Sequence, residues 1–246
     1  MLPFLNVFGL ALPMAPFIIL LGIWFGLTLT EKHAHRHKLN PDVLYNLAFT
    51  ALIAGVLGAR LSYVIQFPDA FISDPSSLIS INFGLFDPIG GMVVGLLAAI
   101  IYGQRKELPF WATLDAFPPL FAILMVAIPL ANLASGFAYG SESELPWAID
   151  LWSANRHPAQ VYEALGAIGI LWFLWPTKIH AKRISGAIFL QFVILSGFAR
   201  LFFEVFRGDS LITVYNLRTA QIIAWLILVI GIWGYSQITN KRIEKK

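Results

Sequence analysis

Arginines and carboxylates alternate at helical spacing in the stretch ARLFFEVFRGD, which begins at residue 199. Arg200 and Glu204 are four residues apart, and Glu204 and Arg207 are three apart, so one helix face would carry positive, negative and positive charge. A carboxylate between two guanidiniums can hold both of them while their remaining N–H groups stay available to a ligand. The pattern therefore predicts a site that captures a phosphate headgroup.

A second polar cluster occupies the stretch RHPAQVYE, residues 156–163. Its candidate site residues are Arg156, His157, Gln160, Tyr162 and Glu163. His157 is a candidate general base, because histidine is the usual base near neutral pH. The alternative is that His157 is only a helix-start residue bonded to backbone, since Pro158 at a first helical position marks a helix entry. Tyr162 and Glu163 are further candidates for the base.

The composition places these clusters in a membrane protein. Of the 246 residues, 58% are hydrophobic and 13% are charged, and the mean hydropathy is +0.72. Soluble domains are roughly 45–50% apolar and about 25% charged. Ordinary soluble enzymes, disordered chains and coiled coils are therefore excluded. The absence of cysteine excludes disulfides, thiolate catalysis by this chain and cysteine-based metal sites.

Seven segments are long and apolar enough to cross a bilayer as helices, for which about 20 residues are needed. The connections between these segments are polar. None of the seven segments alternates in the period-two pattern of a barrel strand, and backbone groups in lipid must be satisfied internally. We therefore predict an all-α polytopic membrane protein with seven transmembrane helices, in a single integral-membrane domain over residues 1–246. The predicted spans lie near 13–30, 43–66, 86–103, 115–137, 159–176, 185–205 and 219–237.

The 17 lysines and arginines are unevenly distributed along the chain. Twelve of them follow odd-numbered spans, and the positive-inside rule makes that side cytoplasmic, with the N-terminus outside and the C-terminus inside. These twelve are Lys32, Arg36, Lys38, Arg105, Lys106, Lys178, Lys182, Arg183, Lys241, Arg242, Lys245 and Lys246. The first of these loops also contains His33, His35 and His37, which we expect to be solvated, with metal binding as the alternative.

Five arginines remain that topology does not explain, and they fall inside predicted spans or near their outer ends. They are Arg60, Arg156, Arg200, Arg207 and Arg218. A charge in a span costs a few kcal/mol and usually faces the bundle interior, so such residues are candidates for a functional site. The alternative is a salt-bridge network that only ties helices together. Three polar clusters at one membrane depth favour a site: the two stretches described above and the stretch GARLSYV, which holds Arg60.

Two other polar features receive simpler interpretations. Asp115 and Asn132 are expected to hydrogen-bond across helices. The acidic outer loop 138–157 is expected to be a solvated connection, with a short substrate-facing lid as the alternative.

The polar clusters resemble those of the prolipoprotein diacylglyceryl transferase family, over about residues 52–235. RHPAQVYE is similar to the family's RHPxQLYE, and ARLFFEVFRGD is similar to RFxxEFxRxPD. GARLSYV resembles GGRxGYV, and residues 115–140 match the span that ends in the signature GRxGNFxNxExxG. The resemblance implies a seven-span inner-membrane enzyme with its N-terminus outside. Such an enzyme transfers a diacylglyceryl group from phosphatidylglycerol to the lipobox cysteine of a preprolipoprotein.

The resemblance also implies roles for individual residues. Arg200 and Glu204 are the implied catalytic residues, and His157 is the third predicted catalytic residue because it could substitute for the family histidine that this chain lacks. The implied substrate-binding residues are Arg60, Gly90, Gly91, Asn132, Gly136, Gly140, Arg156, Gln160, Tyr162, Glu163 and Arg207. The expected partners are phosphatidylglycerol, the signal peptide of a preprolipoprotein and other membrane lipids. No cofactor, metal or nucleic acid is expected. The protein is expected to be a monomer in a bacterial plasma membrane.

The chain lacks four residues of the family pattern, one of which is a first-span tyrosine without a clear match near Ala15, Pro16 and Phe17. Where the family has a histidine before two glycines, this chain reads DPIGG from Asp87 to Gly91, so that histidine is absent. The signature arginine and glutamate fall on Pro129 and Phe137. Asp87 is either new to the site or a simple helix cap. These losses motivate an alternative function, a catalytically degenerate paralogue that binds a phospholipid or lipoprotein precursor. A seven-span receptor or transporter would leave the arginine motifs unexplained.

Overall fold

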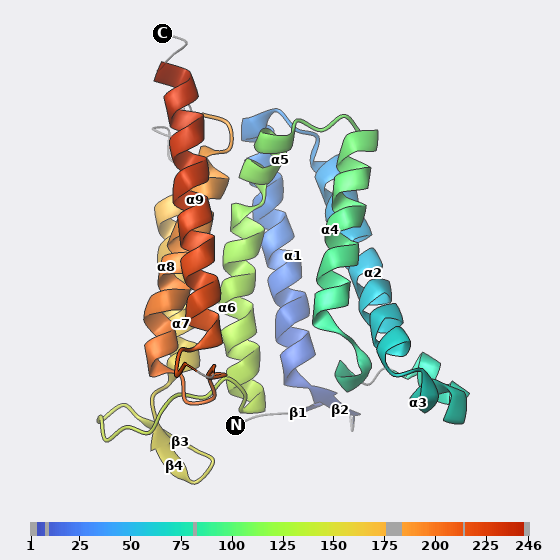
Figure 1. Ribbon diagram of the computed structural model, residues 1–246, viewed down its shortest axis with the longest axis vertical. Helices are drawn as coiled ribbons and strands as arrows, with labels where there is room; N and C mark the ends of the chain where they lie inside the picture. Colours follow the sequence, from blue (N-terminus) through green and yellow to red (C-terminus); the bar gives the residue numbers. More distant parts are fainter. Residues whose placement is uncertain (1–3, 8–9, 81–82, 176–183, 214, 244–246) are drawn as a thin grey trace. The chain divides into compact units, whose positions relative to one another are not determined.

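The computed structural model describes residues 4–7, 10–80, 83–175, 184–213 and 215–243 of the chain (Figure 1). The described chain is mostly helical and divides into two compact units. One unit comprises Met1–His37 and Leu114–Lys246, and the other comprises Lys38–Thr113. Each unit is described by itself.

The described part of the first unit is a bundle of five helices with two short hairpins. The helices are α1 (Met14–Ala34), α6 (Pro118–Ser135), α7 (Ala159–Leu174), α8 (Ala187–Phe203) and α9 (Thr219–Ile243). They pack in chain order, α1 on α6, α6 on α7, α7 on α8 and α8 on α9. The antiparallel strand pairs are β1 (Phe4–Val7) with β2 (Leu10–Pro13) and β3 (Ile149–Leu151) with β4 (Ala154–Arg156). The unit also contains the 3-10 turns η1 (His35–His37) and η5 (Glu204–Phe206). The short helix α5 (Phe110–Ala116) begins in the second unit and leads into α6.

Neighbouring helices of this bundle run antiparallel, which gathers the polar clusters at one end. In Figure 1, α7 and α9 begin where α6 and α8 finish, and the β3–β4 hairpin lies beyond that end. We call it the hairpin end. The segments 136–163 and 200–218 therefore meet there, although they are far apart in the sequence.

The second unit is built on a pair of packed helices, α2 (Pro41–Gln66) and α4 (Pro88–Arg105). In the sequence, α2 and α4 are connected by α3 (Pro68–Ser73) and the 3-10 turns η2 (Pro75–Ile79) and η3 (Phe83–Leu85). A glycine lets the two helices approach: a Cβ on Gly58 would lie 2.4 Å from Val94 Cβ. Small residues at such contacts are typical of helix packing in membranes.

Six stretches of the described chain are helices long and apolar enough to cross a membrane. They are Met14–His37, Pro41–Gln66, Pro88–Arg105, Phe110–Ser135, Ala187–Phe206 and Thr219–Asn240. Six of the seven predicted spans are thereby confirmed as apolar helices of spanning length. The fifth, predicted near 159–176, is α7, which has 16 residues. At 1.5 Å per residue α7 is about 24 Å long, less than the roughly 30 Å of a hydrocarbon core. Residue 176 lies outside the described residues.

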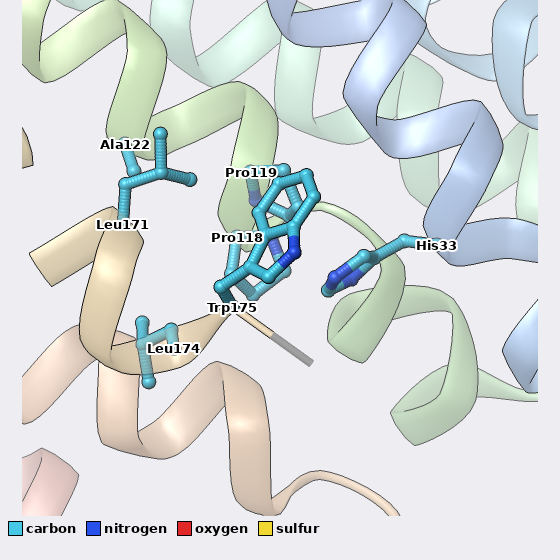
Figure 2. Close-up of a pocket in the computed structure, with 7 residues that line it drawn as sticks. All are labelled: His33, Pro118, Pro119, Ala122, Leu171, Leu174 and Trp175. Atoms are coloured by element: carbon cyan, nitrogen blue, oxygen red, sulfur yellow. The ribbon is translucent and has the colours of Figure 1, made fainter. Parts of the chain in front are cut away.

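The histidine loop after the first span differs from the prediction. Helix α1 continues to Ala34, so His33 lies in its last turn and is only 2% exposed. Figure 2 shows the His33 ring pointing toward Trp175, and the two ring centroids are 6.1 Å apart. The pocket drawn there is lined by His33, Pro118, Pro119, Ala122, Leu171, Leu174 and Trp175. The solvated prediction is wrong for His33, because the longer helix buries it against α6 and α7, whereas His35 is exposed.

Asp115, in α5 just before α6, connects this segment to the start of α8. Its carboxylate is 1% exposed and accepts hydrogen bonds from the Gly186 N–H at 2.6 Å and the Phe189 N–H at 2.8 Å. These amides begin α8, where free N–H groups and the helix dipole favour an anion. The predicted cross-helix bonding of Asp115 is confirmed. It fixes the helix whose far end carries Arg200.

Candidate active site

Two arginines converge on one carboxylate oxygen at the hairpin end. Arg200 Nη1 lies 3.0 Å and Arg207 Nη1 lies 3.4 Å from Glu163 Oε1. Glu163 belongs to the first turns of α7, Arg200 to the last turn of α8, and Arg207 follows η5. The Arg200 side chain is 39% exposed, against 13% for each of the other two. Arg200 is therefore the guanidinium that a ligand reaches more easily.

Glu204 does not stand between the two arginines as the spacing predicted. Its Oε2 lies 2.8 Å from Arg200 Nη2, which confirms the four-residue pair. The carboxylates that contact Arg207 are Glu163 and Asp209, with Arg207 Nη2 2.8 Å from Asp209 Oδ1. The three-residue pair is wrong because α8 ends before Glu204 and the backbone at Arg207 is extended, with φ −76° and ψ 134°. The plus–minus–plus arrangement exists, but Glu163 of another helix supplies its negative charge.

Glu204 is held from both sides in a buried position. Its side chain is 1% exposed, and Ser210 Oγ donates to Oε1 at 2.6 Å. Arg218 Nη1 donates to the Glu204 carbonyl oxygen, to the Arg207 carbonyl oxygen at 3.1 Å and to Ser210 Oγ at 3.3 Å. The sequence motifs assigned no role to Arg218 or Ser210. The only signal for Arg218 was its place outside the basic loops of a charge-poor chain.

The cluster as a whole has no excess charge. Its three guanidiniums and three carboxylates are Arg200, Arg207, Arg218, Glu163, Glu204 and Asp209. A bound phosphate must therefore share guanidiniums that carboxylates already contact. A guanidinium has five N–H donors, and the contacts of Arg200 with described residues are the two carboxylates of Glu163 and Glu204. Donors of Arg200 remain for a ligand.

Arg156 is engaged with the loop that carries it. Its Nε donates to the Leu151 carbonyl oxygen at 3.1 Å and its Nη1 to the Gly140 carbonyl oxygen at 3.3 Å. Nη2 lies 3.4 Å from Glu142 Oε1, and the guanidinium stacks 4.8 Å from the Tyr139 ring centroid. These contacts tie the β3–β4 hairpin together. Substrate binding by Arg156 stays a prediction.

The His157 ring contacts a hydrogen-bonded pair of aromatic side chains. Trp147 Nε1 donates to Tyr162 Oη at 2.7 Å, and His157 Nδ1 lies 3.4 Å from the same oxygen. The ring also packs edge-on against Phe206, with centroids 5.3 Å apart. The main-chain N–H of His157 donates to the Ser141 carbonyl oxygen at 2.9 Å. The predicted backbone hydrogen bond of His157 at the helix entry is therefore present. Of the two ring nitrogens, Nδ1 faces Tyr162.

The start of α7 is fixed against the end of α6. Pro158 is the residue before the first helical turn, one position earlier than predicted. Gln160 is fully buried and donates from Nε2 to the Phe137 carbonyl oxygen at 2.8 Å, while its Oε1 has no hydrogen-bond partner in the described chain. Gly136 ends α6 with φ 75°, and the Phe137 N–H donates to the Asn132 carbonyl oxygen at 3.0 Å. Asn132 and Gly136 therefore shape the helix end near Gln160.

Gly140 lies where three chain segments touch. A Cβ at this position would lie 2.1 Å from the His157 carbonyl oxygen, so a side chain cannot be accommodated without backbone movement. Gly140 also forms an isolated β-bridge with Arg207. The carbonyl oxygen of the preceding residue, Tyr139, accepts a hydrogen bond from the Gly208 N–H at 2.9 Å. Gly140 thus connects the His157 segment with the Arg207 turn.

Arg60 belongs to the second unit and is bound there by backbone and aromatic groups. It donates to the Leu85 carbonyl oxygen at 2.8 Å and to the Ser77 carbonyl oxygen. Its guanidinium carbon lies 5.4 Å from the Phe71 ring centroid and 5.1 Å from that of Phe86. Arg60 therefore secures the connection between α2 and α4.

Asp87 is the N-cap of α4. Its carboxylate accepts from the N–H groups of Ile89 at 3.1 Å and Gly90 at 3.0 Å. Ser62 Oγ donates at 2.6 Å and Gln66 Nε2 at 2.9 Å. The Ser62 hydroxyl first, and then the backbone N–H groups, hold the pKa of Asp87 below its usual value. The helix-cap interpretation of Asp87 is confirmed, and a carboxylate bound by four donors is a poor proton acceptor.

The glycines after Asp87 are packing positions. A Cβ on Gly90 would lie 2.2 Å from Ser62 Cβ, and one on Gly91 would lie 2.8 Å from Ala59 Cβ. Both contacts bring α4 against α2. A direct role of Gly90 and Gly91 in substrate binding stays a prediction.

The fold and the site together define a polytopic membrane protein with an ion-paired arginine cluster suited to an anionic group. The sequence model of the family "Prolipoprotein diacylglyceryl transferase" matches residues 4–236. The chain belongs to this family, which confirms the resemblance of its motifs.

Relatives named phosphatidylglycerol–prolipoprotein diacylglyceryl transferase are similar to nearly the whole chain. That of Finegoldia magna is 29% identical over 227 residues, covering 92% of this chain and 91% of the relative. That of Clostridium tetani is 28% identical over 239 residues, covering 94% and 95%. That of Clostridioides difficile is 26% identical over 243 residues, covering 96% and 94%.

Proposed function

We propose that this chain transfers the diacylglyceryl group of phosphatidylglycerol to a prolipoprotein. The relatives that bear this activity in their names match it nearly end to end. For the same reason a non-catalytic lipid-binding paralogue is not favoured. The observation that carries the proposal is the convergence of Arg200 and Arg207 on one oxygen of Glu163.

The reaction gives an arginine cluster a defined task. The sulfur of the acceptor cysteine forms a bond to the diacylglyceryl carbon, the bond from that carbon to the phosphate oxygen breaks, and glycerol phosphate leaves. The leaving phosphate gains negative charge as this bond breaks, and preorganised guanidiniums stabilise such charge. In the proposal Arg200, the more exposed guanidinium, contacts the phosphate, while Glu204 and Glu163 hold its orientation.

The thiol proton needs an acceptor, because an unperturbed cysteine thiol ionises only near pH 8.5. We assign this role to His157, whose Nδ1 faces Tyr162 and whose Nε2 is the nitrogen left to take the proton. The positive field of the arginines also favours the thiolate. The remaining predicted substrate-binding residues of the first unit are proposed to shape the lipid and peptide site; they are Asn132, Gly136, Gly140, Arg156, Gln160 and Tyr162. Substrate binding by Arg60, Gly90 and Gly91 of the second unit stays a prediction.

The proposal includes a topology. Helix α7 would cross the membrane as the fifth of seven spans, with the N-terminus outside, the C-terminus cytoplasmic and the hairpin end at the outer face of a bacterial plasma membrane. The basic residues after odd-numbered spans support this orientation. Residues 1–246 would act as one domain and as a monomer, on phosphatidylglycerol and a lipobox-bearing signal peptide.

A reconstituted transfer assay tests the function. The purified chain is placed in vesicles with a lipobox peptide and phosphatidylglycerol labelled in its headgroup glycerol. It is expected to release labelled glycerol phosphate and to form the peptide thioether. Arg200→Gln is expected to abolish transfer, and Arg105→Gln, at an exposed position ending α4, is the matched control. Well-folded wild-type protein that forms no thioether would contradict the proposal.

A genetic test separates an enzyme from a lipid-binding paralogue. Expression of the chain is expected to restore growth of a bacterium depleted of its own diacylglyceryl transferase. Growth restored equally by Arg200→Gln would show that transfer by this site is not the function.

A further inference from the structure

Arg218 reaches back from the start of α9 to the turn that carries Glu204 and Arg207. Its Nη1 donates to the carbonyl oxygens of both residues and to Ser210 Oγ. The side chain is half-buried, so these contacts are partly removed from solvent. No motif of the sequence accounts for an arginine at this position.

The acceptors of Arg218 lie where a cation is most useful. The last carbonyl groups of a helix have no intrahelical donors, and the C-terminal end of the helix dipole is negative. The Glu204 carbonyl oxygen, just after α8, receives both the Arg207 N–H at 3.2 Å and Arg218 Nη1. Arg218 therefore stabilises the exit of the chain from α8 in the conformation that turns Arg207 away from the helix axis.

The backbone of Arg218 is itself well anchored. Its carbonyl oxygen accepts from the N–H groups of Gln221 at 3.0 Å and Ile222 at 3.2 Å, in the first turn of α9. It forms an isolated β-bridge with Ile212, and the Thr219 N–H donates to the Leu211 carbonyl oxygen at 2.9 Å. Arg218 thus connects the Glu204–Ser210 turn to a rigid helix start.

The same turn has a second, independent support on its other side. The Ser141 N–H donates to the Phe206 carbonyl oxygen at 2.8 Å, and the Gly208 N–H donates to the Tyr139 carbonyl oxygen at 2.9 Å. Loss of Arg218 contacts would therefore leave the turn attached but free to change direction. A change of direction displaces the Arg207 guanidinium from Glu163 without unfolding the site.

We propose that Arg218 is a positioning residue that sets the spacing of the Arg200 and Arg207 guanidiniums. It acts on Arg207 through two carbonyl groups and on buried Glu204 through Ser210, which donates to Glu204 Oε1 at 2.6 Å. The proposal rests on the transferase function described above. Arg218 contacts the turn and not the phosphate, so its effect passes through Arg207.

The test is Arg218→Lys, which keeps the charge but carries its ammonium on a shorter, flexible stem that does not hold a donor at the position of Nη1. Per folded molecule, the KM for phosphatidylglycerol is expected to rise at least tenfold, whereas a merely structural residue would alter yield and leave KM unchanged. In an Arg207→Lys background, the further effect of Arg218→Lys is expected to fall below twofold. Arg105→Lys is the matched control and is expected to change neither constant.

Two kinetic outcomes and one lipid-retention outcome would overturn the proposal. One kinetic outcome is an unchanged KM in folded Arg218→Lys, and the other is a full additional effect in the Arg207→Lys background. Phosphatidylglycerol co-purifying with the protein, measured by lipid extraction and mass spectrometry, provides a readout that does not need turnover. Retention that falls in Arg218→Lys while wild-type transfer is absent would keep the positioning role and reject the transferase. Equal retention of phosphatidylglycerol by Arg218→Lys and by the wild-type protein would reject the positioning role.

Discussion

Glu163 contacts Arg200, the guanidinium that is proposed to bind the substrate phosphate, so the Glu163 carboxylate and the phosphate would compete for it. Its Oε1 lies 3.0 Å from Arg200 Nη1 and 3.4 Å from Arg207 Nη1. Glu163→Gln keeps an oxygen acceptor of nearly the same shape and removes the negative charge. We expect the variant to bind phosphatidylglycerol more tightly and to turn it over more slowly.

The magnitude follows from the charges that would share one guanidinium. Two anions on the same guanidinium lie about 5–6 Å apart, and at an effective dielectric of about 20–40 they repel by about 1.5–3 kcal/mol. Ions at physiological strength, with a Debye length of about 8 Å, reduce this repulsion to about 1 kcal/mol. One kcal/mol corresponds to a KM lower by about fivefold. The kcat is expected to fall, because Arg207 loses a charged anchor.

The assay is initial-rate kinetics in mixed micelles over a range of phosphatidylglycerol mole fractions. Glu144→Gln, at an exposed carboxylate of the loop 138–157, is the matched control and should leave both constants unchanged. The KM difference between Glu163→Gln and wild type should shrink in about 1 M salt, where the Debye length is about 3 Å. A KM that rises in Glu163→Gln would refute the reasoning, since Glu163 would then align the arginines and not compete with phosphate.

Three further outcomes are expected. Arg200→Gln should lower the free energy of unfolding by about 2–3 kcal/mol because it strands the carboxylate of Glu204, and adding Glu204→Gln should restore part of it in thermal melts. Gly140→Ala should destabilise the protein by about 1–3 kcal/mol and reduce transfer, since its Cβ meets a backbone carbonyl. Asp87→Asn should lower the melting temperature at pH 7 relative to wild type. Because the Ser62 hydroxyl depresses the pKa of Asp87, its contribution is complete above its usual pKa of 3.8 and is lost as pH falls below that value.

Each of these outcomes has its own control. Gly169→Ala introduces the same methyl group into α7 where a Cβ meets nothing within 4 Å, so it should leave stability nearly unchanged or raise it. Additive effects of the two changes at Arg200 and Glu204 would show that they do not form a coupled pair. A melting difference for Asp87→Asn that persists unchanged at pH 3 would contradict the titration argument.

Structural features that depend only on residues close together in the sequence were predicted correctly. The apolar lengths predicted seven spans, and six of them are helices of spanning length in the described chain, because membrane helices satisfy their backbone within one segment. The four-residue pair of Arg200 and Glu204 followed from helix periodicity alone. The cap of α4 by Asp87 is equally local, since its backbone partners are two and three residues away.

Contacts between distant segments were decided by the packing of the helices. Spacing along one helix put Glu204 between two arginines, but α8 ends too early, and Glu163, 44 residues before Arg207, takes that place. Arg218 could be recognised as unexplained, and only the folded turn gave it three acceptors. The sequence by itself determined a membrane bundle, its family and which charges needed an explanation. The tertiary structure decided which carboxylate faces which arginine, because side chains meet across helices only after the helices have packed.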